Sequence, residues 1–226
     1  MTVRTTKSDA FRVAVVDAAV HLFLEKGYHG TNIQNVAQSL GVTRPTVYHY
    51  FTNKESILQA IADDTTFAAQ KLAAKFKIKH PSQDPIKSFC EFVSAYLNLI
   101  LVNPAKFRVS EREVDNLPCE SKALAKDAWR SVHLQFTALI RNGVDIGVFE
   151  VKDPKVAAFG IIGLCNWSAW WYRPEGTHNK ELVIDMLTEM SLKTVQHFKN
   201  SKSNNLNIRN AFEQLATALG YSMEIK

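Results

Sequence analysis

TNIQNVAQSLGVTRPTVYHYFTNK, residues 31–54, is the stretch that decides the fold. Its first half predicts a short helix. Thr31 is a candidate N-cap and Gln34 follows three residues later, which is the spacing of a capping box. Gly41 then predicts the end of the helix, because helices commonly stop at a left-handed residue, a conformation that a Cβ disfavours.

The second half predicts another short helix, over about residues 44–50. Thr43 is its candidate N-cap, and Pro45 lies in the first turn, where a missing N–H costs little. Hydroxyl, guanidinium and phenol groups on its outer face can reach phosphate oxygens and base edges, whereas a merely solvated face carries Glu, Lys and Gln. The pattern predicts a helix-turn-helix whose second helix enters the major groove. The outward residues are Thr43, Arg44, Thr46, Tyr48 and His49.

Over residues 11–60 the chain resembles the TetR family of transcriptional regulators. The shared pattern includes Gly-Tyr at 27–28, Gly-Val-Thr at 41–43 and Tyr-x-Tyr-Phe-x-Asn-Lys-Glu at 48–55. The resemblance implies a homodimer that binds double-stranded operator DNA and responds to a small molecule. It also implies that Lys54 holds a phosphate at a helix start. The candidate DNA-binding residues are Thr31, Thr43, Arg44, Thr46, Tyr48, His49 and Lys54.

Composition excludes several other classes of protein. The net charge of +5 favours binding to polyanions but does not identify which polyanion is bound. The 3 cysteines are widely spaced and form no C-x-x-C pair, so neither a disulfide framework nor a zinc site is indicated. An enzyme would need a cluster such as Glu-x-x-His on facing helices, a nucleophile elbow or a Gly-rich phosphate loop, and only isolated fragments of these occur. We therefore expect no enzyme, no metal and no cofactor.

The chain carries no obvious membrane or secretion signal. Its first residues lack an apolar core of the kind found in signal peptides. The longest apolar run, at 156–172, is shorter than the roughly 20 residues that a bilayer requires. We expect a buried helix there and a cytoplasmic protein.

The whole chain predicts an all-α fold, because no strand-like alternation of any length occurs. Three helix starts are marked by an N-cap residue followed by proline, at Asp84-Pro85, Asn103-Pro104 and Asp153-Pro154. Besides the two short helices, the expected helices cover about 9–26, 54–79, 85–102, 104–117, 120–146, 154–172 and 179–198. The expected domains are 1–53 for DNA binding, 54–199 for effector binding and dimerisation, and 200–226 as a polar linker with a short helix.

The helix at 154–172 is apolar almost all round, so it needs cover on most sides. A second subunit supplies such cover, and Gly160 and Gly163 would allow close approach of helices. TetR-like proteins dimerise through their last two large helices, which the resemblance places at about 154–172 and 179–198. The sequence leaves open whether the tail at 200–226 would dock on the body or on the partner subunit.

The resemblance also implies an effector held among the later helices. The motif Asn-Trp-x-x-Trp-Trp-Tyr-Arg-Pro from Asn166, and the stretch 110–118, resemble the TetR branch that senses acyl-CoA thioesters of fatty-acid and sterol breakdown. An aromatic cluster at a helix end more often packs in a core or dimer seam than in a pocket. Candidate effector-binding residues are Phe92, Tyr96, Phe107, Arg108, Trp129, His133, Asn166, Trp167, Trp170, Trp171 and Arg173.

The alternative within the same fold is a sensor of lipophilic drugs or cations. Such a sensor needs an acidic side chain among aromatic ones, because a cation binds a carboxylate and the faces of rings. Glu111, Asp115 and Asp145 are the candidates, although none lies within a strongly apolar run.

Overall fold

The computed structural model describes residues 7–76 and 84–196, and the all-α prediction is confirmed for these ranges. Apart from one isolated bridge between Phe149 and Gln196, this part of the chain forms no β-structure. The helices are α1 (Lys7–Lys26), α2 (Ile33–Ser39), α3 (Arg44–Tyr48), α4 (Lys54–Lys75), α5 (Pro85–Val102), α6 (Pro104–Arg112), the 3₁₀ turn η1 (Val114–Asn116), α7 (Cys119–Asp145), α8 (Pro154–Trp171) and α9 (Lys180–Val195).

Capping and glycine signals located most helix ends correctly. The side chains of Asp84, Asn103 and Asp153 each accept a hydrogen bond from a backbone N–H in the first turn that follows. Gly41 has a φ of 65°, in the left-handed region where a Cβ is unfavourable. The predicted ends at residue 117 for α6 and residue 50 for α3 are wrong. Each helix stops earlier, α6 passing into the 3₁₀ turn η1.

The predicted cap at Thr31 is also wrong, by one residue. Asn32 caps α2 and forms a capping box with Asn35, in which each side chain accepts from the other residue's backbone N–H. Thr31 is buried, at 2% exposure, and its hydroxyl donates to the carbonyl oxygens of Leu22 and Gly27. It therefore joins α1 to the start of α2 instead of facing outward. The predicted tail at 200–226 lies outside the described residues.

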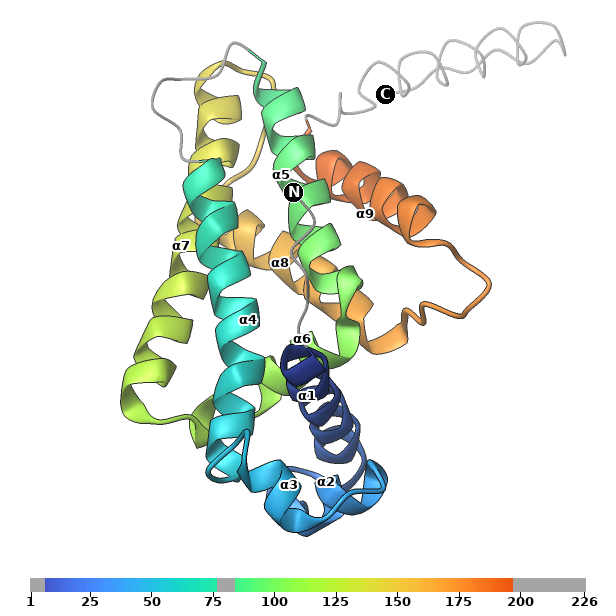
Figure 1. Cartoon of the computed structure of the whole chain (residues 1–226). Helices are drawn as coiled ribbons and strands as arrows, with labels where there is room; N and C mark the ends of the chain where they lie inside the picture. Colours follow the sequence, from blue (N-terminus) through green and yellow to red (C-terminus); the bar gives the residue numbers. More distant parts are fainter. Residues whose placement is uncertain (1–6, 77–83, 197–226) are drawn as a thin grey trace, which may run out of the picture.

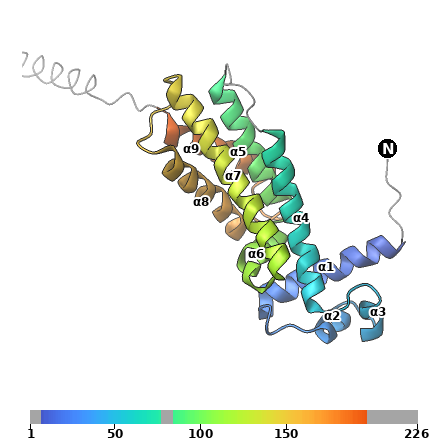
Figure 2. The ribbon, with the colours of Figure 1, turned by 90° about the vertical axis from the view of Figure 1, so that its left-hand side faces the viewer.

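Two apolar cores lie at opposite ends of the molecule. Figure 1 shows α1, α2 and α3 gathered at the lower end, with α4 and α7 rising side by side from it, and Figure 2 shows the same arrangement from another side. The first core joins α1, α2, α3 and the start of α4 through residues such as Phe23, Val47 and Ile61. The second joins α5, α7, α8 and α9 through residues such as Phe92 and Phe136.

Helix α6 belongs to both cores. Its Val109 is buried in the first core, and its Phe107 is buried in the second. The ammonium of Lys106 lies 3.5 Å from a carboxylate oxygen of Asp17 on α1 and 3.5 Å from one of Asp64 on α4. Arg112 Nη2 donates to the carbonyl oxygen of Phe23 at the far end of α1. A displacement of α6 would therefore also shift the unit formed by α1, α2 and α3.

Candidate nucleic-acid interface and effector cavity

The predicted outward face of α3 is confirmed. Thr43, Arg44, Tyr48 and His49 are exposed and Thr46 is half-buried, while Val47 on the opposite face is completely buried. Val47 anchors α3 in the first core, so the polar side chains stand on a rigid support.

Two contacts organise this face before any ligand binds. Arg44 Nη2 donates to the Tyr48 hydroxyl over 2.7 Å, and its guanidinium carbon lies 5.1 Å from the centre of the Tyr48 ring. The hydroxyls of Thr43 and Thr46 are 2.9 Å apart, so Thr43 bonds to Thr46 in place of a side-chain cap. Such internal pairing reduces the entropy lost when side chains are ordered at an interface.

A cleft of about 360 Å³ opens beside α3. It lies among the start of α2, the face of α3 and the start of α4, and its lining includes Asn32, Arg44, Asn53 and Lys54. Lys54 Nζ lies 4.0 Å from the centre of the Tyr28 ring and donates to the Tyr28 carbonyl oxygen over 2.8 Å. The cleft lies beside the N-termini of α2 and α4 and beside the cationic side chains of Arg44 and Lys54. These groups favour binding of an anion such as a backbone phosphate.

A second cavity, of about 410 Å³, lies among α5, α6, α7 and α8. It brings together four of the predicted effector residues, Tyr96, Trp129, His133 and Asn166. Its lining also contains side chains that were not placed in a site beforehand. These are Arg130, Val132, Phe159 and Ile162, and the lining also includes Glu111, one of the acidic candidates for a cation sensor.

A chain of polar contacts crosses the cavity wall. The buried Tyr96 hydroxyl donates to Asn166 Oδ1 over 2.6 Å, and Asn166 Nδ2 lies 3.5 Å from Glu111 Oε2. Removal from water raises the pKa of Glu111 above its usual range. On the opposite wall the His133 ring stacks on Phe159 at 4.0 Å. The cavity thus combines aromatic walls with one carboxyl group.

The other predicted effector residues do not line this cavity. Phe92 is fully buried against Phe136, and Phe107 lies beneath Trp129 in the core. Arg108 and Arg173 lie outside the cavity, next to Trp170. The three neighbouring tryptophans, Trp167, Trp170 and Trp171, are 64%, 43% and 43% exposed. These three side chains do not line the cavity because α8 turns its small residues, such as Ala158 and Ala169, toward the core.

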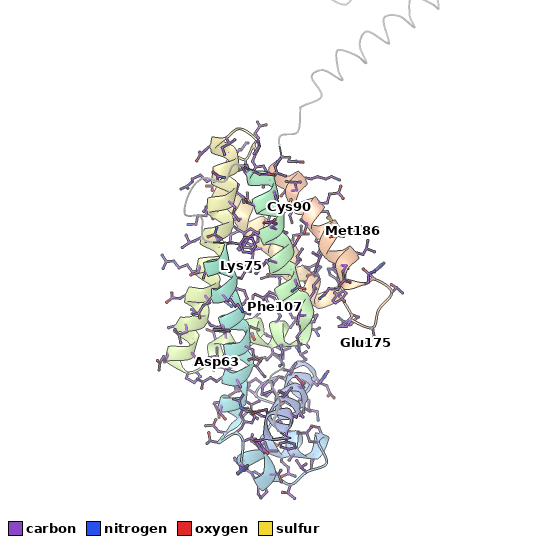
Figure 3. The ribbon with its side chains drawn as sticks, turned by 45° about the horizontal axis from the view of Figure 1, so that its top comes forward. Asp63, Lys75, Cys90, Phe107, Glu175 and Met186 are labelled. Atoms are coloured by element: carbon purple, nitrogen blue, oxygen red, sulfur yellow. The ribbon has the colours of Figure 1, made fainter. Side chains whose placement is uncertain are left out.

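The exposed side of α8 continues onto α9 as one apolar face. Added Cβ atoms on Gly160 and Gly163 would meet no heavy atom within 4 Å, so both glycines look into open space. Met186 points outward from α9 (Figure 3). The exposed apolar residues of the face are Val156, Phe159, Trp167, Trp170, Trp171, Leu182, Met186 and Met190. A face of this extent is typical of a protein interface.

Nothing in residues 7–76 and 84–196 forms a cluster of three or more His, Cys, Asp or Glu side chains that could hold a metal ion. Helix α5 is apolar and long enough to cross a membrane by composition, but side chains such as Phe89, Phe92 and Tyr96 pack it into the second core. Cys165 is buried, and this burial raises the pKa of its thiol to about 12.

The exposed polar helix, the two cores and the apolar face together are the features of a helix-turn-helix protein with a second, helical domain. Comparison with known families agrees. Residues 15–61 match the family of bacterial regulatory proteins called tetR, and residues 82–195 match the tetracyclin repressor-like C-terminal domain. The chain belongs to the TetR family of DNA-binding transcriptional regulators.

Three distant relatives match over most of the chain. It is 26% identical over 176 residues to the probable HTH-type transcriptional regulator ArpR of Pseudomonas putida, a match covering 71% of this chain and 83% of ArpR. The crystal structure of PfmR from Thermus thermophilus is similar with a TM-score of 0.67 and 27% identity, over 79% of this chain and 97% of PfmR. AibR in complex with isovaleryl coenzyme A and operator DNA shares the fold, with a TM-score of 0.63 and 21% identity over 79% and 96%.

Proposed function

We propose that this TetR-family chain is a homodimeric repressor that leaves a palindromic operator when a small molecule binds. Residues 1–53 read DNA, and residues 54–199 bind the effector and form the dimer. The observation that carries the proposal is the exposed, prearranged pair of Arg44 and Tyr48 on a helix whose other face is locked in a core. Such a protein works in the cytoplasm, where its operator lies.

The DNA contacts follow from the side chains on α3. The guanidinium and phenol of the pair are suited to base edges and phosphates, and Thr43, Thr46 and His49 supply further hydrogen-bonding groups. Lys54 and the helix starts beside it form a place for a backbone phosphate. Thr31 also lines this cleft, but we give its hydroxyl no DNA contact because it lies in the interior, bonded to the carbonyl oxygens of Leu22 and Gly27.

The dimer forms through α8 and α9. Support comes from the exposed apolar side chains of Val156, Leu182, Met186 and Met190 and from the open space above Gly160 and Gly163, with the tryptophans at the end of α8 left outside the interface. A two-fold axis through this face sets the distance between the two copies of α3. Reading of successive major grooves requires a spacing of roughly 34 Å.

The effector we propose is an acyl-CoA thioester, whose acyl group lies in the cavity lined by Tyr96, Trp129 and Phe159. Pockets of a few hundred Å³ are of the usual size for small ligands. The cavity of about 410 Å³ suits an acyl group but leaves the nucleotide outside. AibR, a structural neighbour, is described in complex with isovaleryl coenzyme A, and the motif from Asn166 supports the same class.

The route from effector to DNA runs through α6. Glu111 lies in the cavity wall, and its neighbour Arg112 bonds to the Phe23 carbonyl oxygen of α1. A ligand that moves this end of α6 changes the position of the three-helix unit. The two reading helices of a dimer then lose the groove spacing, so DNA binding weakens.

A second candidate effector class is a lipophilic cation. The specific observation in its favour is Glu111, a carboxyl group in a cavity with Tyr96, Trp129 and Phe159. A cation would bind the ionised carboxylate and the aromatic faces, and would offset the cost of burying the charge.

A thermal-shift screen separates the two classes. We expect acyl-CoA esters to raise the unfolding temperature and to release fluorescent operator DNA at the same concentrations. Tetraphenylphosphonium serves as the test cation, and Glu111→Gln as the diagnostic variant, because loss of its carboxylate abolishes cation binding but leaves an apolar acyl group accommodated. Stabilisation by the cation alone, lost in Glu111→Gln, would replace the acyl-CoA proposal with the cation sensor.

A further inference from the structure

Two arginines from different helices meet at Trp170, just outside the cavity. The guanidinium carbon of Arg108, on α6, lies 5.8 Å from the centre of the Trp170 ring. Arg173, which follows α8, donates from Nη1 to the carbonyl oxygens of Trp170 and Tyr172, each over 3.1 Å. Arg112 lies one helical turn beyond Arg108 on α6. We call these three residues the arginine cluster.

The cluster carries more positive charge than its neighbours neutralise. Arg112 is paired with Glu113, with its Nε 2.7 Å from Oε1. Arg108 Nε is buried and has no hydrogen-bond partner among the described residues. Burial, together with the charges of Arg173 and Arg112, lowers the pKa of Arg108. Like charges close together repel one another, so an anion near these guanidinium groups would offset that repulsion.

The surroundings of the cluster fit a phosphate that belongs to a nucleotide. Trp167 and Trp170 stack with ring centres 6.4 Å apart and leave aromatic surface exposed. Bases bind to such surfaces by stacking, and arginine pairs with phosphate through parallel N–H groups.

The cluster also lies next to the cavity on two helices at once. On α6, Arg108 is three residues from Glu111 of the cavity wall, and on α8, Trp170 is four residues from Asn166. Residues three or four apart are neighbours on one helix face. A single ligand can therefore reach both places.

We propose that Arg108, Arg112 and Arg173 bind the phosphate groups of the effector's nucleotide, with Trp170 against its base, while the acyl group occupies the cavity. This inference rests on the acyl-CoA function proposed above and deepens it by assigning the phosphate subsite. The proposed subsite also explains how effector binding affects the DNA-binding unit. Arg112 is the residue that bonds to Phe23 of α1, so a phosphate drawing on Arg112 acts directly on that link.

The test uses calorimetry on the full chain with four probes: coenzyme A without an acyl group, octanoyl-CoA, inorganic pyrophosphate, and the octanoyl thioester of N-acetylcysteamine, which lacks nucleotide and phosphates. The variants are Arg173→Gln, at an exposed position, and Arg108→Gln combined with Arg173→Gln. Arg141→Gln, an exposed arginine on α7, is the matched control.

We expect coenzyme A to bind the wild-type chain. Its affinity should fall about 10-fold in Arg173→Gln and about 100-fold in the double variant, because these variants lose one and two charge-assisted contacts. The truncated octanoyl thioester should bind all four proteins equally. Affinity for coenzyme A should fall with added salt, whereas affinity for the truncated thioester should not.

Equal affinity of coenzyme A for the wild type and the double variant would overturn the subsite, as would absence of coenzyme A binding to the wild type. Failure of the truncated thioester to bind, with coenzyme A binding intact and dependent on the arginines, would retain the subsite and overturn the acyl role of the cavity. Binding of inorganic pyrophosphate as tight as that of coenzyme A would remove Trp170 and the base from the site.

Discussion

The DNA-reading face and the effector cavity are built in opposite ways. The face on α3 consists of side chains within residues 43–49, exposed and bonded to one another, above a single buried anchor at Val47. The cavity draws side chains from four helices, and several of these also pack the second core. Substitutions on the face should therefore change binding alone. Substitutions in the cavity should change binding and stability together.

The largest effect should come from the reading face. Arg44→Ala and Tyr48→Ala each remove one half of the prearranged pair, and we expect operator affinity to fall at least about 100-fold, roughly 2.7 kcal/mol. Because both side chains are exposed, the unfolding temperature should stay nearly unchanged. Fluorescence anisotropy and differential scanning calorimetry measure the two quantities. Arg141→Ala, on α7, is the control with unchanged affinity.

The next effect concerns the dimer that holds two reading faces together. Gly163→Leu places a side chain where this subunit leaves open space, so the monomer should keep its fold or gain up to about 1 kcal/mol from helix propensity. The same side chain blocks close approach of a partner helix, and we expect dimer dissociation to rise about 30-fold, roughly 2 kcal/mol. Analytical ultracentrifugation gives the dissociation constant. An unchanged dimer would remove this part of α8 from the interface, and Ala123→Leu on α7 is the control.

A smaller effect should appear in the cavity. Tyr96→Phe removes a buried hydroxyl and leaves Asn166 Oδ1 without its donor. We expect a loss of about 1–2 kcal/mol in unfolding free energy, measured by urea denaturation, with unchanged operator affinity in the absence of effector. A variant as stable as the wild type would show that the cavity is less tightly coupled to the core than we describe.

Thr31→Val sharpens the comparison from within the DNA-binding unit. Its hydroxyl lies in the interior and bonds to backbone carbonyls, so this residue should behave like the cavity and unlike its neighbours on α3. We expect a loss of about 1 kcal/mol in unfolding free energy, with operator affinity reduced only in proportion to the unfolded fraction. Selective loss of DNA affinity without loss of stability would restore Thr31 to the interface.

The smallest effect is a pH dependence that comes from Glu111. Because burial raises its pKa, the folded chain holds this proton more tightly than the unfolded chain does. Stability from this group is greatest below the usual glutamate pKa of 4.5 and falls as pH rises through the raised folded value. Glu111→Gln should lose that slope. The measurement is urea denaturation at a series of pH values, and identical slopes in both proteins would contradict it.

The same contrast explains what the sequence could predict. Caps and glycine stops act over three or four residues, so the bounds of α5 and the outward side of α3 followed from spacing alone. The error at Thr31 was one residue, since Asn32 beside it is an equally good cap. The cavity depends on which helix faces meet. Helix α8 is apolar on all sides, so its pattern could not tell that Trp167, Trp170 and Trp171 face outward.

Residue spacing could have predicted some of the cavity-lining residues that the sequence analysis did not name. Phe159, Ile162 and Asn166 follow one another at intervals of three and four residues, and Trp129 and His133 are four residues apart, so each set occupies one helix face. Those faces could have been listed as candidates from Asn166 and Trp129. No local sequence pattern shows that these two helix faces turn toward Glu111 on α6.

The central claim is that two copies of the α3 face, held at fixed separation, dock into duplex DNA. Its most direct test is selection of bound duplexes from a random pool, with wild-type and Arg44→Ala protein in parallel. We expect the wild-type protein to enrich a palindrome whose half-sites are about one helical turn apart or a multiple of it, and Arg44→Ala to enrich none. A pool without two-fold symmetry, or the same palindrome recovered by both proteins, would contradict it.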